Sequence, residues 1–339
     1  MTQRRRTLWA LPALGVALLG AVAAFAAAPA PNIVTSLTLF AGTGEGLWRS
    51  NDWGGTWQRV VGEQTGVRVE NIGAVRAILP RGPEVYIAGD AGVYLSTDFG
   101  EAWEPLSPTP GVRAILVSRW PQSDPTVFVG TEQGLLISRD AGHNFSKTAL
   151  SGASVERLDW PGGAVVAAGG AGLVLTRDEG GSVLGPGEGL PTGPVRAMVL
   201  SSYFAADPVI FAAPEAGGVY RSGDGGTKWA PAGLVGERVA DLVWLGPFLY
   251  AAGASGFYRS EDAGRKWSRL SDSPGEPRRL VFPLAPAAGL EAFLATAQGV
   301  FYTADAGQHW RPAGLAGQEV FVVATFPPPE PSPGKKKRR

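Results

Sequence analysis

The chain of 339 residues contains 30 basic and 30 acidic side chains, and this formal net charge of zero gives no reason to expect nucleic-acid binding. The absence of cysteine excludes disulfides, cysteine-ligated zinc, a cysteine nucleophile and a lipid-anchored cysteine, and the two histidines make a histidine-based site unexpected. We therefore expect no metal and no cofactor. The 48 glycines and 28 prolines, with only 18% charged residues, are typical of many short strands joined by tight turns.

Residues 1–28 have the pattern of an export signal. Three arginines at positions 4–6 precede an apolar run over residues 8–28 that is interrupted only by Pro12, and residues 24–26 form a small-x-small cleavage motif. The run is also long enough to span a bilayer as an uncleaved anchor, with the arginines inside. Both alternatives predict that the rest of the chain lies outside the cytoplasm, whether periplasmic, secreted or anchored facing outward. Residues 29–36 then form a linker.

From residue 50 onward the chain repeats one pattern, Ser/Thr-x-Asp-x-Gly-x-x-Trp. Seven copies begin at Ser50, Ser96, Ser138, Thr176, Ser222, Ser260 and Thr303. The aspartates at their third position are Asp52, Asp98, Asp140, Asp178, Asp224, Asp262 and Asp305. The third copy has Phe145 in place of the tryptophan, and the fourth has Val183. A period of roughly 40 residues is typical of propeller blades rather than of helical repeats.

Each copy lies between two apolar strands and has the residue types of a hairpin turn. The aspartate carboxylate can accept backbone N–H groups, the glycine can adopt a positive φ, and the tryptophan can cover the edge of a blade. These roles account for all three residue types. The seven aspartates are therefore expected to be structural rather than catalytic.

A second repeated signature follows the outer strand that is expected after each turn. It reads Val-Arg-Ala-Ile or a variant of it, and it begins at Val75, Val112, Val155, Val195, Val239 and Pro277. We interpret these segments as the inner strands of blades 2 to 7. Residues 319–326 supply the inner strand that blade 1 lacks, so the C-terminal strand closes the ring and leaves no exposed sheet edge. The expected fold over residues 37–326 is an all-β, seven-bladed propeller of four-stranded antiparallel blades.

The repeated turn is identified as the Asp-box of the bacterial neuraminidase repeat proteins, and this resemblance covers nearly the whole chain after residue 36. In that family the Asp-box is structural and lies on the face opposite the ligand-binding face. The blade count, the Val-Arg-Ala-Ile signature and the N-terminal signal or anchor more closely resemble the photosystem II stability/assembly factor family and its relatives in non-photosynthetic bacteria. That resemblance implies a non-enzymatic propeller outside the cytoplasm, with an arginine patch that meets a membrane protein. Nothing in the chain indicates a photosynthetic host, so the photosystem itself is not carried over.

Four arginines occupy the second position of the inner-strand signature: Arg76, Arg113, Arg196 and Arg278. Inner strands begin on the face opposite the Asp-boxes, so these side chains are expected around the mouth of the central channel, where they would bind carboxylates, phosphates or an acidic protein segment. Glu156, Ala240 and Phe321 take this position in blades 4, 6 and 1. The alternative is that each arginine pairs with an acidic loop neighbour and ties adjacent blades together. The candidate neighbours are Glu45, Asp90, Glu132 and Glu215.

Two functions compete for this architecture. The first is a binding or assembly scaffold that holds a protein partner, expected to be membrane-associated, at the channel mouth. The second is a sialidase-like glycoside hydrolase or a carbohydrate-binding propeller, with a glycan as its partner. The chain lacks the Arg-Ile-Pro motif of sialidases and an inner-strand tyrosine in register to act as nucleophile. We therefore expect a monomeric, non-enzymatic scaffold and assign no catalytic residue.

Two segments depart from the repeat. Residues 185–191 extend the loop that follows the turn of blade 4, which is explained either by drift under weak constraint or by contact with a partner. Residues 327–339 are proline-rich and end in five basic residues. This tail is expected to be disordered, and its basic end either to be solvated or to contact an anionic surface such as lipid headgroups.

Overall fold

Every regular element in the described part of the chain is a β-strand, and there are 27 of them. The computed structural model describes residues 37–60, 72–118, 123–160, 164–283 and 290–326. The predicted N-terminal segment (1–28), linker (29–36) and basic tail (327–339) lie outside the described residues. Residues 34–339 form a unit separate from residues 1–33, and the description below concerns this second unit. Within the described ranges, no helix has the length and apolar character that crossing a membrane requires.

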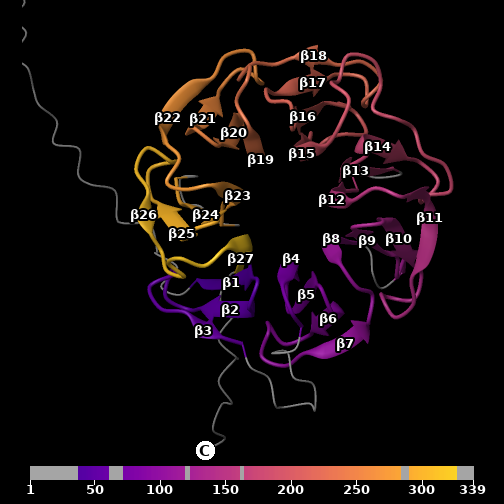
Figure 1. Ribbon diagram of the computed structural model, residues 1–339, viewed down its shortest axis with the longest axis vertical. Helices are drawn as coiled ribbons and strands as arrows, with labels where there is room; N and C mark the ends of the chain where they lie inside the picture. Colours follow the sequence, from indigo (N-terminus) through magenta and orange to yellow (C-terminus); the bar gives the residue numbers. More distant parts are fainter. Residues whose placement is uncertain (1–36, 61–71, 119–122, 161–163, 284–289, 327–339) are drawn as a thin grey trace, which may run out of the picture. The chain divides into compact units, whose positions relative to one another are not determined.

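The strands form seven antiparallel sheets arranged as the blades of a propeller, which confirms the predicted fold class (Figure 1). The inner strands of blades 1 to 7 are β27 (Val320–Phe326), β4 (Val75–Arg81), β8 (Val112–Val117), β12 (Val155–Asp159), β15 (Val195–Leu200), β19 (Val239–Leu245) and β23 (Pro277–Val281). The second strands are β1 (Thr38–Thr43), β5 (Glu84–Gly89), β9 (Val127–Thr131), β13 (Val165–Gly169), β16 (Ile210–Pro214), β20 (Phe248–Gly253) and β24 (Ala292–Thr296).

The third and outer strands complete each sheet. The third strands are β2 (Gly46–Ser50), β6 (Gly92–Ser96), β10 (Gly134–Ser138), β14 (Gly172–Thr176), β17 (Tyr220–Ser222), β21 (Gly256–Ser260) and β25 (Gly299–Thr303). The outer strands are β3 (Gln58–Arg59), β7 (Glu104–Ser107), β11 (Ser146–Ser151), β18 (Ala230–Pro231), β22 (Ser268–Asp272) and β26 (Arg311–Pro312). In blade 4 the outer strand is reduced to the single bridge between Leu175 and Leu184.

Chain direction fixes which turns share a face of the propeller. In a meander of four antiparallel strands, the turn between the second and third strands lies at one end of the blade, together with the loop that leads to the next inner strand. We call this end the mouth face. The Asp-box turns, which join the third and outer strands, lie at the other end, the Asp-box face.

The C-terminal strand closes the ring, as predicted. Strand β27 pairs antiparallel with β1 over six residue pairs, from Thr38–Phe326 to Thr43–Val320. The first and last strands of the unit therefore belong to one sheet, as Figure 1 shows where indigo meets yellow. The inner edge of blade 1 is thus supplied from the other end of the chain.

The core is divided among the contacts between neighbouring blades. Seven clusters of buried apolar side chains each join one blade to the next, including one that joins blade 7 to blade 1. The second strands are buried along nearly their whole length, because alternate side chains of a strand face opposite sides and both sides are covered here. Strand β9, with its sequence Val-Phe-Val-Gly-Thr, is one such element.

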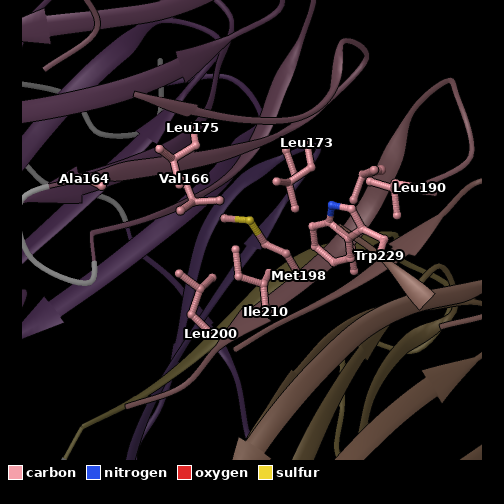
Figure 2. Packing of buried hydrophobic residues seen from close by; sticks show 12 residues of the cluster. Ala164, Val166, Leu173, Leu175, Leu190, Met198, Leu200, Ile210 and Trp229 are labelled. Atoms are coloured by element: carbon pink, nitrogen blue, oxygen red, sulfur yellow. The ribbon is translucent and has the colours of Figure 1, made fainter. Parts of the chain in front are cut away.

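Blade 4 obtains part of its packing from its extended loop. Leu190 is buried against Trp229, which belongs to the Asp-box of blade 5, and the same cluster includes Met198 (Figure 2). The backbone of Glu188 also accepts a hydrogen bond from the N–H of Trp229 at 2.8 Å. After Leu184 the chain thus leaves its own sheet and lies along the next blade, which explains why no full outer strand forms.

The Asp-box turns repeat one set of hydrogen bonds. In the first, Ser50 Oγ donates to Asp52 Oδ1 at 2.8 Å, and the N–H of Gly54 donates to Ser50 Oγ at 2.9 Å. Asp52 Oδ1 also accepts the N–H of Thr56, and the equivalent bond occurs in all seven turns at 2.8–2.9 Å. Gly54 has a φ of 83°, which favours glycine at this position. All seven aspartates are thus engaged in their own turns.

Some box tryptophans also join neighbouring blades. Trp57 Nε1 of blade 1 donates to the carbonyl oxygen of Ala313 in blade 7 at 2.7 Å. Trp267 Nε1 of blade 6 donates to that of Ala232 in blade 5, also at 2.7 Å. The tryptophan therefore does more than cover the edge of its own blade.

Candidate functional site

A β-bulge at one position recurs in all seven inner strands. In β4 the register shifts between Val75 and Ala77, so that Arg76 has no partner across the ladder. Equivalent shifts occur in the other six inner strands. The residues left unpaired are Arg76, Arg113, Glu156, Arg196, Ala240, Arg278 and Phe321. A bulge re-aims the side chain of its extra residue.

These seven residues all line one cavity of about 250 Å³. They stand where the inner strands begin, on the mouth face, so the cavity is the mouth of the central channel. We call it the mouth cavity. Its other lining residues are Arg157, Pro277 and Glu319. The four predicted arginines are therefore brought together, with a fifth that was not predicted. The lining carries five guanidinium groups and two carboxylates, which gives the cavity a positive character.

Each of the four predicted arginines also has an acidic partner. Arg113 contacts Glu132 at 2.6 Å, and Arg196 forms an ion pair with Glu215. Arg76 lies 3.4 Å from Asp90. Three of the four proposed neighbours thus pair as the alternative interpretation stated. For Glu45 no ion pair occurs among the described residues, and its backbone oxygen accepts a hydrogen bond from Arg59.

Arg278 is paired with two carboxylates that the sequence interpretation did not name. Its guanidinium contacts Glu276 and Glu319 at 2.7 Å each. The hydrogen bond from Arg278 holds the pKa of Glu276 below its ordinary value, and the bond from Arg196 does the same for Glu215. These carboxylates are accordingly ionised at neutral pH.

The ion pairs leave hydrogen-bonding capacity in the arginines. Arg113, Arg157 and Arg196 each have a buried Nε without a hydrogen-bond partner in the described structure, although Arg157 Nε lies 3.9 Å from Asp241 Oδ1. A guanidinium has five N–H donors, and one carboxylate uses at most two of them in a bidentate pair. Arg76 is held by its contact with Asp90 and by the ring of Phe321, whose centroid lies 4.3 Å from its guanidinium carbon. The arginines are thus positioned by their acidic neighbours and still able to bind an anion.

A second charged layer crosses the channel beneath the bulged residues. Arg157, Asp241 and Arg279 take the third position of the inner-strand signature in blades 4, 6 and 7, where blades 2, 3 and 5 have alanine. Asp241 is buried and lies 3.5 Å from Arg279 and 3.9 Å from Arg157. Its Oδ2 accepts the backbone N–H of Leu280 at 2.8 Å.

Arg157 reaches across the channel to the opposite blades. Its guanidinium donates to the backbone oxygens of Ala240 and Arg278 at 3.4 Å each. Burial, followed by the charge of Arg279, lowers the pKa of Arg157 to about 10, so it stays cationic at neutral pH. The sequence signal for this layer was the charged third residue of three signatures, which the sequence interpretation did not use.

Arg157 also borders a second cavity, of about 400 Å³, that follows the inner strands toward the Asp-box face. Its walls are mostly apolar and include Leu79, Ile115 and Met198. The channel therefore changes along its length, from a mouth lined by arginines to an apolar lower part. The charged layer lies between the two.

The seven box aspartates do not contribute to the mouth cavity. Hydrogen bonds within the turns lower their pKa, and the bonds from Asn144 bring that of Asp140 to about 2. His309 lies 2.7 Å from Asp305 in the last turn. Among the residues that the structure describes, no group of three or more histidine and acidic side chains could hold a metal ion.

No protein-family model and no curated protein sequence matches the chain. Solved structures share its fold. YCF48 from Cyanidioschyzon merolae is 17% identical, with a TM-score of 0.56 over 82% of this chain and 95% of that one. YCF48 bound to D1 peptide is also 17% identical, with a TM-score of 0.52 over 70% of this chain and 80% of that one.

Glycoside hydrolases have the same fold. A GH74 enzyme from Niastella koreensis is 18% identical, with a TM-score of 0.55 over 73% of this chain. The chain spans 45% of the length of that enzyme and 38% of a second, ancestral GH74 enzyme. At these identities the likeness concerns architecture. The chain is an Asp-box propeller whose fold is shared by YCF48, a photosystem II assembly factor, and by GH74 enzymes.

Proposed function

We propose that this protein is an exported, non-enzymatic scaffold that holds an acidic segment of a protein partner at its mouth cavity, during the assembly of a membrane complex. One observation carries the proposal. Seven equivalent bulges aim their residues at a single cavity, and four of the seven are arginines. An array of guanidinium groups suits carboxylates, which it can bind in pairs of parallel hydrogen bonds.

The size and wall of the cavity favour a side chain or a chain end over a large ligand. About 250 Å³ is below the range of roughly 300–1,000 Å³ that is typical of small-molecule sites. An acidic side chain could enter the cavity while the rest of the partner lies on the mouth face. The peptide-bound YCF48 structure, which has the same fold, supports a protein partner.

The lining supports anion binding better than hydrolysis. A glycosidase of the usual kind needs two carboxylates about 5–10 Å apart across an open cleft, one of them able to carry a proton. Of the two carboxylates in the lining, Glu319 is in an ion pair with Arg278. That carboxylate is thus already engaged by a guanidinium, and Glu156 is the one other carboxylate of the lining.

The N-terminal sequence supports a location outside the cytoplasm. Arginines at positions 4–6 followed by an apolar run over residues 8–28 have the character of a signal or anchor. Fractionation of cells that express the full chain, with protease added to intact cells or spheroplasts, tests this part of the proposal. Protection from the protease in spheroplasts would contradict it.

Crosslinking in the membrane fraction tests the partner. A variant with Arg76, Arg113, Arg196 and Arg278 all changed to glutamine should lose a defined crosslinked protein that the wild type captures. The matched control removes the same charge from the Asp-box face, where Arg139, Arg177, Lys228 and Arg265 are changed to glutamine. Equal capture by both variants, with both folded, would refute the mouth cavity as the binding site.

A further inference from the structure

A cavity of about 710 Å³ on the mouth face lies beside the channel, over blades 2 and 3. We call it the blade 3 groove. It shares Arg76 with the mouth cavity and extends to Lys147 on the outer strand β11. Leu135, Leu136 and Leu150 contribute apolar surface to it. The groove thus continues the mouth cavity outward across one blade.

The groove exists because β11 departs from the regular ladder. Leu136 pairs with Lys147, whereas Gly134 pairs with Ser151, so β11 carries two more residues than β10 over this interval. A bulged strand bends away from its partner. The N–H of Ala149 donates to the carbonyl oxygen of Gly180, in the Asp-box of blade 4, at 2.7 Å. Strand β11 is thus held toward the next blade, at the turn that lacks its aromatic residue.

A cationic side chain stands at each end of the groove. Arg76 marks the inner end, and Lys147, which is exposed and has no hydrogen-bond or ion-pair partner in the described residues, marks the outer end. Two acidic residues also line the groove: Asp90, which lies 3.4 Å from Arg76 at the inner end, and Glu132, which contacts Arg113. Arg76 keeps N–H donors beyond its single contact with Asp90. The leucines lie between the two cationic ends. An occupant should therefore be acidic at both ends and apolar in the middle.

We propose that the blade 3 groove binds an extended continuation of the acidic segment that enters the mouth cavity, with acidic residues at positions i and i+4 and an apolar residue at i+2. This inference rests on the proposed function. Arg76 stands on β4, which lies beside the inner strand β8 of blade 3, and its side chain borders the groove there. The path from β8 to β11 crosses three strand spacings of about 4.8 Å, or about 14 Å, which an extended chain covers in about four residues. Residues i, i+2 and i+4 of an extended chain point to the same side, so all three can face the groove.

Fluorescence anisotropy with two labelled peptides of equal composition tests the spacing on the full-length protein. The first peptide is Gly-Ser-Asp-Ser-Leu-Ser-Asp-Ser-Gly, and the second has the two aspartates adjacent at one end and the leucine at the other. The first should bind about fivefold to tenfold more tightly, because only it can reach both cationic ends together. Its binding should weaken as salt is raised.

Three variants locate the binding. Lys147→Gln and Leu136→Ser should each weaken the first peptide about threefold to fivefold, as expected for one exposed charge contact or one partly buried apolar contact. Lys228→Gln, which removes an exposed lysine from the Asp-box face, should leave binding within about twofold. Circular dichroism and thermal melting confirm that each variant is folded.

The outcomes separate the groove from the mouth cavity. If the variant lacking the four mouth arginines loses the peptide while Lys147→Gln and Leu136→Ser retain wild-type affinity, the groove is overturned and the proposed function stands. Equal affinity for the two peptides likewise overturns the proposed spacing. If the wild type binds neither peptide, or the mouth variant binds as well as the wild type, the proposed function fails as well.

Discussion

Removal of the C-terminal strand is the sharpest test of how this propeller is held together. Deleting residues 319–339 removes β27 and leaves blade 1 without its inner strand. The edge of β1 would then be exposed, and the interfaces of blade 1 with blades 2 and 7 would both lose side chains. We expect this deletion to abolish cooperative folding rather than to weaken it slightly.

The expected loss can be worked out from the buried side chains of β27. Val320, Val322, Val323 and Phe326 are between 0% and 5% exposed. Full burial of such a side chain stabilises a protein by about 1.5–3 kcal/mol, so these four contribute about 6–12 kcal/mol before any hydrogen bond of the ladder is counted. The whole free energy of unfolding of a domain is about 5–15 kcal/mol. The deletion therefore removes most or all of the free energy that favours the folded state.

Urea unfolding followed by tryptophan fluorescence provides the assay. A truncation that removes only residues 327–339 is the matched control, since it deletes the basic tail and keeps β27. The control should unfold cooperatively at the urea concentration of the full chain, while the longer deletion should show no cooperative transition and should aggregate through its open edge. A longer deletion that unfolds cooperatively close to the wild type would refute the argument that β27 closes the ring.

Three further predictions concern single residues. Hydrogen bonds from Asn144 lower the pKa of Asp140 from 3.8 to about 2, so the stabilisation that Asp140 provides is present above pH 3.8 and is lost as the pH falls through about 2. The difference in Tm between wild type and Asp140→Asn should therefore narrow over that interval. A difference that stays constant with pH would contradict this prediction. Gly307→Ala should lower the free energy of unfolding by about 1–2 kcal/mol for its φ of 89°, and by about 1–3 kcal/mol more because the added Cβ would lie 2.1 Å from a phenylalanine ring of blade 6. Gly236→Ala, with a φ of 79° and open space around the added Cβ, should show only the first loss in urea unfolding. Equal losses for the two variants would show that the side chains between blades 6 and 7 rearrange to accept the methyl group. Asp241→Asn should destabilise the folded protein by about 1.5–3 kcal/mol, because it leaves the guanidinium groups of Arg157 and Arg279 without their shared carboxylate. Adding Arg157→Met should restore part of the lost stability in thermal melts. No restoration would argue against repulsion between the two arginines as the cause.

The turns, the blade count and the ring closure could be predicted from the sequence because each depends on a local pattern. The hydrogen bonds of the Asp-box run from Ser50 to Thr56, within one short segment, so a repeated segment implies a repeated turn. The closing strand was predictable because blade 1 lacked an inner strand and residues 319–326 had no blade of their own. The convergence of Arg76, Arg113 and two further arginines on one cavity followed from the same repeat.

Other features depend on register and on contacts between distant segments. The bulge that exposes Arg76 is a mismatch between two strands, which neither strand shows alone. Arg157 meets Asp241 although the two are 84 positions apart in the sequence, because their blades lie across the channel from each other. The partners of Arg278 are Glu276, two residues away, and Glu319 in the next blade. Ion pairs of this kind are decided by side-chain geometry at the mouth.

Sequence alone thus determined the seven-bladed ring and the face on which the arginines lie, since periodic turns and alternating strands are encoded residue by residue. Only the tertiary structure decided how those arginines are paired, which Nε groups lack a hydrogen bond, and that Arg157, Asp241 and Arg279 form a layer across the channel. It also decided that β11 bends toward blade 4 and opens a groove beside Lys147. The physical reason is that pairing register and interblade contacts are cooperative properties of the closed ring, whereas a turn is stabilised by its own few residues.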